Sequence, residues 1–196
     1  MNVLPVILEG TRVRLEPLSL SHHEQLCEIG LDPLLWQLAT TVMQSAQDMK
    51  SYIETALKWQ AEGTALPFAI IEQSSDSVVG STRFGNIDKA NRRLEIGWTW
   101  LARKWQRTAV NTETKFLLLK HAFETLGCIR VEFKTDSLNE KSRNALLRIG
   151  ATEEGILRNH MIAPGGRFRH SVYFSIIHSE WRHVKAALEE KLYLTS

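Results

Sequence analysis

The segment LEIGWTWLARKWQRTAVNTETKFLLLKHAFETLG, residues 94–127, predicts a strand, a short basic loop and a long helix. A period of two divides the strand into two faces. The first face carries the large apolar side chains of Leu94, Ile96, Trp98 and Trp100. The second face carries Glu95, Gly97 and Thr99. The strand is therefore expected to pack its tryptophan face against a core.

The helix of this segment is expected to be buried on most of its surface. Its apolar residues recur at helical spacing and form a wide stripe: Phe116, Leu117, Leu118, Leu119, Ala122, Phe123 and Leu126. Asn111 or Thr112 is predicted to cap its first turn, and Gly127 to follow its last.

The junction between this strand and this helix is a candidate anion site. The first N–H groups of a helix lack intrahelical partners, and the helix dipole is positive there. Four cations add to this charge: Arg103, Lys104, Arg107 and Lys115. The alternative is a basic loop that is merely solvated, because any α/β protein has such junctions. The pattern alone leaves both interpretations open.

Two segments together resemble a known family. EIGWTWLARKWQRTAVNTETKFLLLKHAFE and NEKSRNALLRIGATEEGILR are similar to the GNAT acyl-CoA N-acyltransferases, on the RimJ/RimL-like branch of ribosomal-protein N-terminal acetyltransferases. The resemblance covers residues 8–182, nearly the whole chain. It implies an α/β fold with a mixed, mostly antiparallel central sheet, a splayed parallel strand pair and helices on both faces.

The family's pyrophosphate loop has the form Gln/Arg-x-x-Gly-x-Gly/Ala, and this chain departs from it. Gln106 stands at the start, but Ala109 and Asn111 occupy the two glycine positions. A small residue lets the backbone approach a phosphate closely, which Ala109 nearly preserves. Asn111 is bulkier, although it tolerates left-handed dihedral angles. The departure affects the expected geometry of the loop more than its role.

Composition is that of an ordinary globular chain, and one domain over residues 1–196 is expected. The chain is 43% hydrophobic and 23% charged, with a net charge of +2. This weak charge does not argue for nucleic acid, and no run approaches the ~20 apolar residues of a membrane span. Cys27 and Cys128 are predicted to be buried thiols in a reducing cytoplasm. No cluster of cysteine and histidine has zinc spacing, so no metal is expected.

The remaining elements can be predicted in order along the chain. Strands are expected within residues 6–18, 67–73, 77–87 and 128–136, and in a final hairpin around a Pro-Gly-Gly turn. Helices are expected at 21–30, capped by Ser21, at 46–62, at 139–150, capped by Asn139, and at 178–192. Gly80 within its strand suggests a bulge or the close approach of another backbone. The strand, helix and strand over residues 94–136 predict a parallel right-handed crossover.

The resemblance assigns cofactor and substrate positions. Backbone groups of Thr99, Trp100 and Leu101 match the strand to which the pantetheine arm of acetyl-CoA adds. The remaining cofactor contacts fall in the loop, at the start of the helix that follows it and at the start of the helix at 139–150: Gln106, Arg107, Thr108, Ala109, Val110, Asn111, Thr112, Asn139 and Ser142. Candidate acceptor contacts are Trp36, Arg83 and Asn86. The alternatives are a packing tryptophan and an outward arginine on a half-exposed strand.

Acetyl transfer to an amine needs a base, because a protein amine is largely protonated at neutral pH. Glu95 is the candidate, since it lies on the cofactor strand and is expected to face away from the tryptophans. A surface ion pair with Arg92 or Arg93 is the alternative. Many family members place a tyrosine seven residues after the capping asparagine, and Leu146 stands there. Ser142 is the remaining hydroxyl near the expected thiol.

The predicted function is direct acetyl transfer from acetyl-CoA to a primary amine within a ternary complex. The acceptor could be a protein N-terminus or a small molecule. A non-catalytic acyl-CoA sensor is the alternative, motivated by the altered loop and the missing tyrosine. An RNA-binding role through Arg103, Lys104 and Arg107 is disfavoured by the low net charge. One further departure, His170 after Arg169 where the branch often has Asp, bears on the choice of acceptor. A homodimer is left open.

Overall fold

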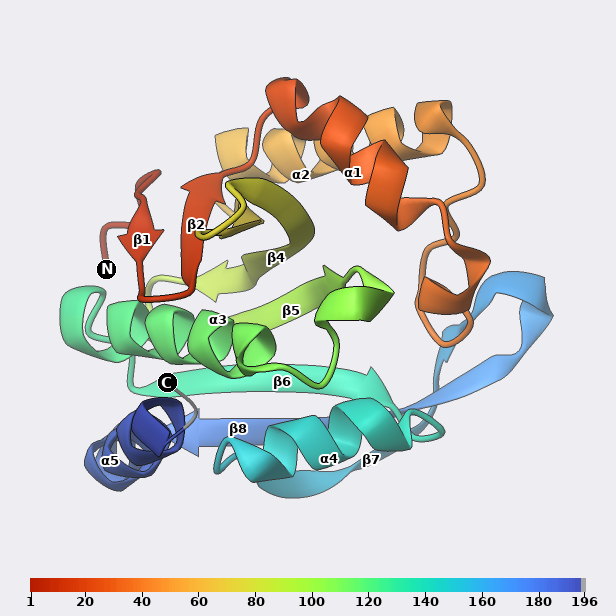
Figure 1. Cartoon of the computed structure of the whole chain (residues 1–196). Coiled ribbons are helices and arrows are strands. Elements are labelled where there is room, and N and C mark those ends of the chain that lie inside the picture. Colours follow the sequence, from red (N-terminus) through yellow and green to blue (C-terminus); the bar gives the residue numbers. More distant parts are fainter. Residues whose placement is uncertain (195–196) are drawn as a thin grey trace.

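An eight-stranded mixed sheet organises residues 1–194, the part of the chain that the computed structural model describes (Figure 1). The strands lie in the order β1-β2-β3-β4-β5-β6-β8-β7. Their bounds are β1 Leu8–Glu9, β2 Val13–Pro17, β3 Leu66–Glu72, β4 Ser77–Asp88, β5 Arg93–Leu101, β6 Arg130–Asp136, β7 Thr152–Ile162 and β8 Phe168–Ile177. The helices are α1 His23–Gly30, α2 Ala46–Ala61, α3 Ala109–Lys120, α4 Glu140–Arg148 and α5 His178–Leu194.

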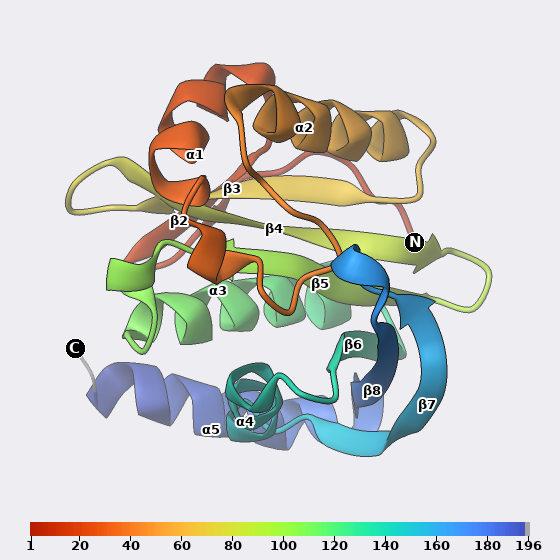
Figure 2. The same cartoon turned by 90° about the vertical axis from the view of Figure 1, so that its right-hand side faces the viewer.

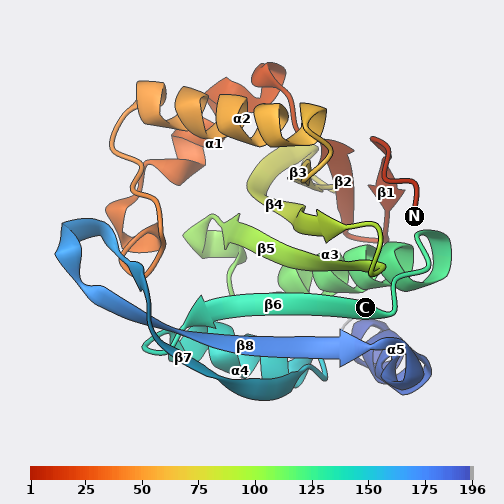
Figure 3. The same ribbon diagram turned by 180° about the vertical axis from the view of Figure 1, so that it is seen from behind.

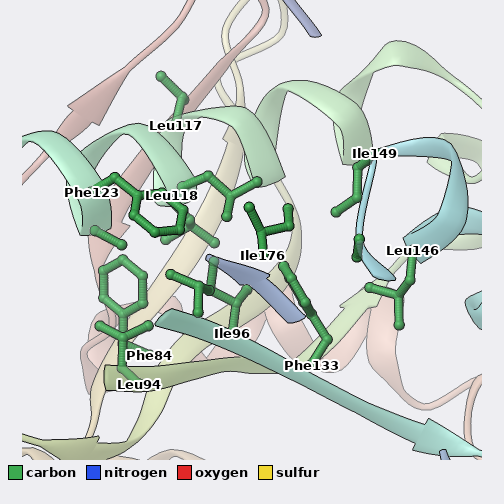
Figure 4. Close-up of a cluster of buried hydrophobic side chains, with 14 of the residues drawn as sticks. Phe84, Leu94, Ile96, Leu117, Leu118, Phe123, Phe133, Leu146, Ile149 and Ile176 are labelled. Carbon is green, nitrogen blue, oxygen red and sulfur yellow. The ribbon is translucent and has the colours of Figure 1, made fainter. Parts of the chain in front are cut away.

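Helices cover both faces of the sheet, as the sequence predicts. Figure 2 shows α1 and α2 on one face and α3, α4 and α5 on the other. The larger core lies under α3 and α5 and includes Leu94, Leu118 and Phe133 (Figure 4). A smaller core under α1 and α2 includes Ile53, Ala69 and Trp100. The two apolar layers explain why β3, between them, is buried at every residue.

The parallel pair is β5 and β6, joined by α3 in the predicted crossover. All other neighbouring strands are antiparallel. Ladder pairing between β5 and β6 covers Arg93–Glu95 and Arg130–Glu132 only. Beyond it the described strands separate, and Figure 3 shows them diverging toward their carboxyl ends. The expected splayed pair is therefore confirmed.

A bulge at Trp98 overturns the predicted faces of β5. Ser81 pairs with Trp100 but Arg83 pairs with Gly97, so β5 holds one extra residue. Trp98 is the bulged residue and adopts a φ of 50°. Leu94 and Ile96 face α3, whereas Trp98 and Trp100 face α1 and α2. The prediction that all four share a face was wrong, because strict alternation assumes an unbroken ladder.

Glycines mark two close approaches near this bulge. Gly80 confirms the predicted contact between backbones, since a methyl group there would lie 2.1 Å from the Trp100 carbonyl oxygen. Gly85, the register partner of Glu95, lies under the Trp98 ring. Glu95 therefore shares the face of the tryptophans, and the prediction that it faces away from them was wrong.

Two helix starts also differ from prediction. Thr108 caps α3, and its Oγ1 accepts from the N–H of Val110 at 3.3 Å. The predicted caps Asn111 and Thr112 lie inside the first turn of α3. The start of α1 has no side-chain cap, so the prediction for Ser21 was wrong. The predicted cap of α4 is confirmed: Asn139 Oδ1 accepts from the N–H of Ser142 at 3.0 Å.

Candidate active site

The separating ends of β5 and β6 define the candidate site. Parallel strands place their carboxyl ends at the same edge, so α3 and α4, which follow these strands, both begin at this edge (Figure 1). The backbone of β5 from Ile96 to Leu101 pairs with β4 on one side only. These backbone groups of β5 thus have no strand beside them on the β6 side, and an extended ligand can add there as a strand; the region between the separating strands is called the slot below. This is the region to which Thr99, Trp100 and Leu101 were assigned.

Local hydrogen bonds hold the loop between β5 and α3 in a compact conformation. A 3-10 turn, Arg103–Trp105, precedes Gln106, whose Nε2 donates to the Leu101 carbonyl at 3.1 Å. Arg107 adopts a φ of 62° and Thr108 Oγ1 donates to the Trp105 carbonyl at 2.8 Å. The Leu101 carbonyl is therefore already engaged, and Gln106 shapes the loop.

The N-terminus of α3 suits an anion. The N–H groups of Ala109 and Asn111 belong to the first turn, where no intrahelical acceptor exists. Arg107 is exposed beside them. Arg103 pairs with Asp32 at 3.5 Å, and Lys104 lies over the ring of Trp105. The donors and the charge fit a diphosphate group, and the slot leads away from them into the sheet.

Lys115 is not part of this mobile charge, contrary to expectation. It is buried on the sheet-facing side of α3, and its Nζ donates to Thr99 Oγ1 at 2.6 Å. Thr99 Oγ1 in turn lies 2.7 Å from Thr82 Oγ1. Burial lowers the pKa of Lys115 to about 7, against the opposing effect of the Glu95 charge. The Phe133 ring, from β6, lies 5.8 Å away. The amine thus lies at the floor of the slot.

Glu95 lies on the opposite face and is only 3% exposed. Its Oε2 accepts from Asn86 Nδ2 at 2.8 Å and lies 3.4 Å from Lys134 Nζ. Its Oε1 lies over Gly97, where a methyl group would come within 2.8 Å. The alternative, a surface ion pair with Arg92 or Arg93, was wrong, because the Glu95 carboxylate is buried and pairs with Lys134, while Arg93 binds Asp88 and Glu132. The structure brings the predicted residues Glu95 and Asn86 into direct contact.

Arg83 is buried on the same face, so the alternative of an outward residue was wrong. It is 1% exposed and stacks against three rings, with its Cζ 4.8 Å from Tyr52, 5.4 Å from Trp59 and 5.2 Å from Trp98. Its Nε and Nη2 have no hydrogen-bond partner within residues 1–194.

Trp36 packs in the smaller core. Its Nε1 donates to the Gly30 carbonyl at 2.7 Å, and its ring centre lies 5.4 Å from that of Trp100. The structure thus gives it a packing role, and a contact with the acceptor stays a prediction. On α4, Ser142 is half-buried, and Leu146 is buried in the larger core.

The sequence did not single out several residues that line this face. Arg169 is 5% exposed on β8, and burial lowers its pKa despite the Asp136 and Glu95 charges. Burial also pushes the pKa of Asp136 upward, yet Arg167 and nearby charges hold it below its ordinary value. Alternation in β6 could have placed Lys134 and Asp136 on the face away from the core. Partners from different strands could not be matched without the register.

The described part of the chain contains neither a metal-binding cluster nor a membrane-spanning helix. No group of three or more His, Cys, Asp and Glu residues within 1–194 is placed to hold a metal ion. No helix in the same range is both long and apolar enough to cross a membrane.

Comparison with known proteins gives the site a context. The model of the acetyltransferase (GNAT) domain family matches residues 12–152. "Uncharacterized N-acetyltransferase p20" of Bacillus licheniformis is 28% identical over 171 residues, which are 87% of this chain and 95% of that protein. "Putative ribosomal N-acetyltransferase YdaF" of Bacillus subtilis is 35% identical over 109 residues, 56% of this chain and 58% of that protein.

Solved structures of acetyltransferases have the same fold. A GCN5-related N-acetyltransferase from Brucella melitensis superposes with a TM-score of 0.90 at 31% identity, covering 97% of this chain and 86% of that one. Mycobacterium smegmatis RimJ in complex with CoA-disulfide has the same fold, with a TM-score of 0.80 at 23% identity over 94% of this chain and 95% of that one. The chain therefore belongs to the GNAT family of N-acetyltransferases.

Proposed function

We propose that this enzyme transfers an acetyl group from acetyl-CoA to a primary amine by direct attack within a ternary complex. The observation that carries the proposal is the separation of β5 from β6 beyond Glu95, with the N-terminus of α3 at the same edge of the sheet and Glu95 buried beside it. Acetyl-CoA is an extended molecule with a diphosphate at one end of its pantetheine arm and a thioester at the other. The helix N-terminus matches the diphosphate, and the slot matches the arm that carries the thioester.

The cofactor contacts proposed from the family fall along this path. The backbone of Thr99, Trp100 and Leu101 would bind the pantetheine amides. Residues of the loop and of the α3 and α4 N-termini would bind the phosphates and the thiol end: Gln106, Arg107, Thr108, Ala109, Val110, Asn111, Thr112, Asn139 and Ser142. Because Asn139 Oδ1 already caps α4, its free donor is the side-chain amide.

The chemistry assigns a proton path to the chain's own groups. Glu95 accepts a proton from the ammonium form of the acceptor, directly or through a water. The free amine attacks the thioester carbonyl, a carbon–nitrogen bond forms and the carbon–sulfur bond breaks, and the nitrogen loses its second proton to solvent. The thiolate leaves and is protonated by solvent or through Ser142. A thiol with a pKa of ~8.5 is a fair leaving group, so the leucine at position 146 does not prevent the reaction.

Asn86 and Lys134 keep Glu95 in place, because both contact the same carboxylate oxygen. That leaves Oε1, over Gly97, as the oxygen that accepts the proton. The two free cysteines, Cys27 and Cys128, and the use of a metabolic acyl donor fit a cytoplasmic enzyme. The acceptor would be a protein N-terminus or a small-molecule amine.

The test is an assay of free thiol release from acetyl-CoA with a panel of amines. Glu95→Gln should lower kcat by about 10²- to 10⁴-fold with little change in acetyl-CoA affinity. Glu132→Gln is the matched control, since this carboxylate lies on the same sheet face but pairs with Arg93 and Arg130. Tight acetyl-CoA binding without transfer to any amine would favour the non-catalytic sensor instead.

A further inference from the structure

All the buried charged nitrogen atoms that lack a hydrogen bond in residues 1–194 lie on one face of the sheet. They are Nε and Nη2 of Arg83 and Nε of Arg169. The nearest carboxylate to Arg169 Nε is that of Asp136, 3.9 Å away and beyond hydrogen-bond distance. A buried donor without a partner is costly, so each such group calls for an explanation.

Strand register places both arginines beside Glu95. Arg83 pairs with Gly97 and Gly85 with Glu95, so Arg83 and Glu95 project from the same face two residues apart. On β8, Arg169 lies two residues from Ser171, the partner of Asp136. The Glu95 charge also acts on the pKa of Arg169. The two arginines therefore flank the proposed base from opposite sides of the slot.

Positive charge exceeds negative charge on this part of the face. Beside Glu95 and Asp136 it holds the cations Arg83, Lys134, Arg167 and Arg169, whereas Glu132 on the same face is bound by Arg93 and Arg130. Glu95 is already bound by Lys134, and Asp136 by Arg167. The surplus thus falls on Arg83 and Arg169, whose charges have no hydrogen-bonded counter-ion among the described residues.

The orientation of Arg83 indicates the kind of partner that fits. The rings of Tyr52, Trp59 and Trp98 satisfy the faces of its guanidinium through cation–π contacts. The in-plane N–H groups are not satisfied by such contacts. Nε–H and Nη2–H are the adjacent pair that a carboxylate binds side-on with two parallel hydrogen bonds. Trp59 and Trp98 are only half-buried, so two of the rings that contact Arg83 are partly exposed to solvent.

We propose that the amine acceptor carries a carboxylate, which Arg83 binds side-on while Arg169 adds charge on the other side of Glu95. This inference rests on the proposed acetyl transfer. The carboxylate can come from a free amino acid or from an acidic residue near the N-terminus of a peptide. Polyamines and other polycations are poor acceptors, because Arg83, Lys134 and Arg169 repel them.

Paired acceptors that differ only in the carboxylate test this directly. One arm compares amino acids with their amides, and the other compares peptides with Asp or Asn as the second residue. In at least one arm, kcat/KM should be about 10- to 100-fold higher for the acid, as expected for charged hydrogen bonds in a buried site. The arm that shows the preference identifies the source. Equal kcat/KM for acid and neutral partner in both arms would overturn the inference while leaving acetyl transfer intact.

Two variants connect the preference to Arg83. Arg83→Met should reduce the ratio of acid to neutral kcat/KM to near one, and Arg83→Lys should restore part of it. The ratio within one variant does not depend on the folded fraction, so partial unfolding does not confound it. Arg93→Met is the control, because Arg93 is exposed and pairs with Asp88 and Glu132. A ratio unchanged by Arg83→Met would count against the assignment.

A binding measurement separates this inference from the proposed reaction. Calorimetry in the presence of CoA would compare an N-acetyl amino acid, or an acetylated Asp peptide, with its neutral counterpart. The acid should bind about 10- to 100-fold more tightly, and Arg83→Met should remove the difference. Equal binding would contradict the carboxylate site. Preferential binding without turnover of any amine would support the site and contradict acetyl transfer.

Discussion

Lys115 Nζ lies 2.6 Å from Thr99 Oγ1, at the floor of the slot where β5 and β6 separate. Within the described chain the amine has no carboxylate partner at ion-pair distance, and the residue is buried. A charged amine in such a place is disfavoured, which is why its pKa falls to about 7. The protein therefore holds a lysine that loses its charge near neutral pH beside the proposed path of the thioester.

The pH dependence of stability should reveal this lysine. Its pKa is about 7 in the folded chain and ~10.4 when unfolded, so between these values the unfolded chain binds more protons. Stability should therefore rise with pH, by ~3 kcal/mol between about pH 7 and pH 9.5. Urea unfolding of the wild type and Lys115→Met would measure it. The difference between the two isolates Lys115, and parallel pH curves would contradict the assignment.

Gly97→Ala should impair catalysis through Glu95. The added methyl group would lie 2.8 Å from Glu95 Oε1 and force the carboxylate to shift. A displacement of about 1 Å at a reacting group can cost ~10²-fold in rate, so kcat should fall by at least about tenfold. Acetyl-CoA affinity measured by calorimetry should stay the same. An unchanged kcat in this variant would indicate that the carboxylate does not act from this position.

Glu113→Ala should destabilise the fold. The carboxylate on α3 accepts from the N–H groups of Thr11, Arg12 and Val13 at 2.8–2.9 Å and joins β2 to the helix. Removing it leaves buried donors unpaired, at a cost of ~3 kcal/mol. Denaturant unfolding measures the loss, with the exposed Glu140→Ala as control. A loss equal to that of the control would show that these bonds contribute little.

Thr108→Ala should weaken both α3 and the anion site. Its hydroxyl caps the helix and also donates to the Trp105 carbonyl. Loss of a cap of this kind costs ~1 kcal/mol, so the unfolding midpoint should fall modestly. Because the loop that presents the first-turn N–H groups loosens, acetyl-CoA should bind less tightly. Thr108→Ser, which keeps the hydroxyl, should retain both properties; a similar loss in both variants would argue against the cap.

Much of the architecture is predictable because it follows from hydrophobic periodicity and from the residue types that end or cap helices and strands. The alternation in β6, the helical spacing in α3 and the order of strand, helix and strand lead to the parallel crossover. Gly80 and Asn139 also do what their residue types suggest, one allowing a close backbone approach and the other capping α4. These signals are local, so a single sequence contains them.

The details of the site are less predictable because they depend on one backbone irregularity and on register. Nothing in the alternation of β5 marks Trp98 as the bulged residue, yet its φ of 50° decides that Glu95 and Trp98 share a face. Lys115 is one helical turn from Leu118 and Leu119, which could have indicated its burial. Its charge favoured a surface position instead. The cage around Arg83 joins α2, β4 and β5, which no local pattern links.

The most direct test of the account is a calorimetric titration of acetyl-CoA into the wild type and into Arg107→Ala. The exposed arginine beside the α3 N-terminus should contribute to phosphate binding, so the variant should bind acetyl-CoA about tenfold less tightly than a micromolar wild type. Arg148→Ala, which removes an exposed arginine at the C-terminal end of α4, is the control and should bind acetyl-CoA like the wild type. If the wild type binds neither acetyl-CoA nor CoA, the slot between β5 and β6 is not an acyl-CoA site and the proposed reaction fails with it.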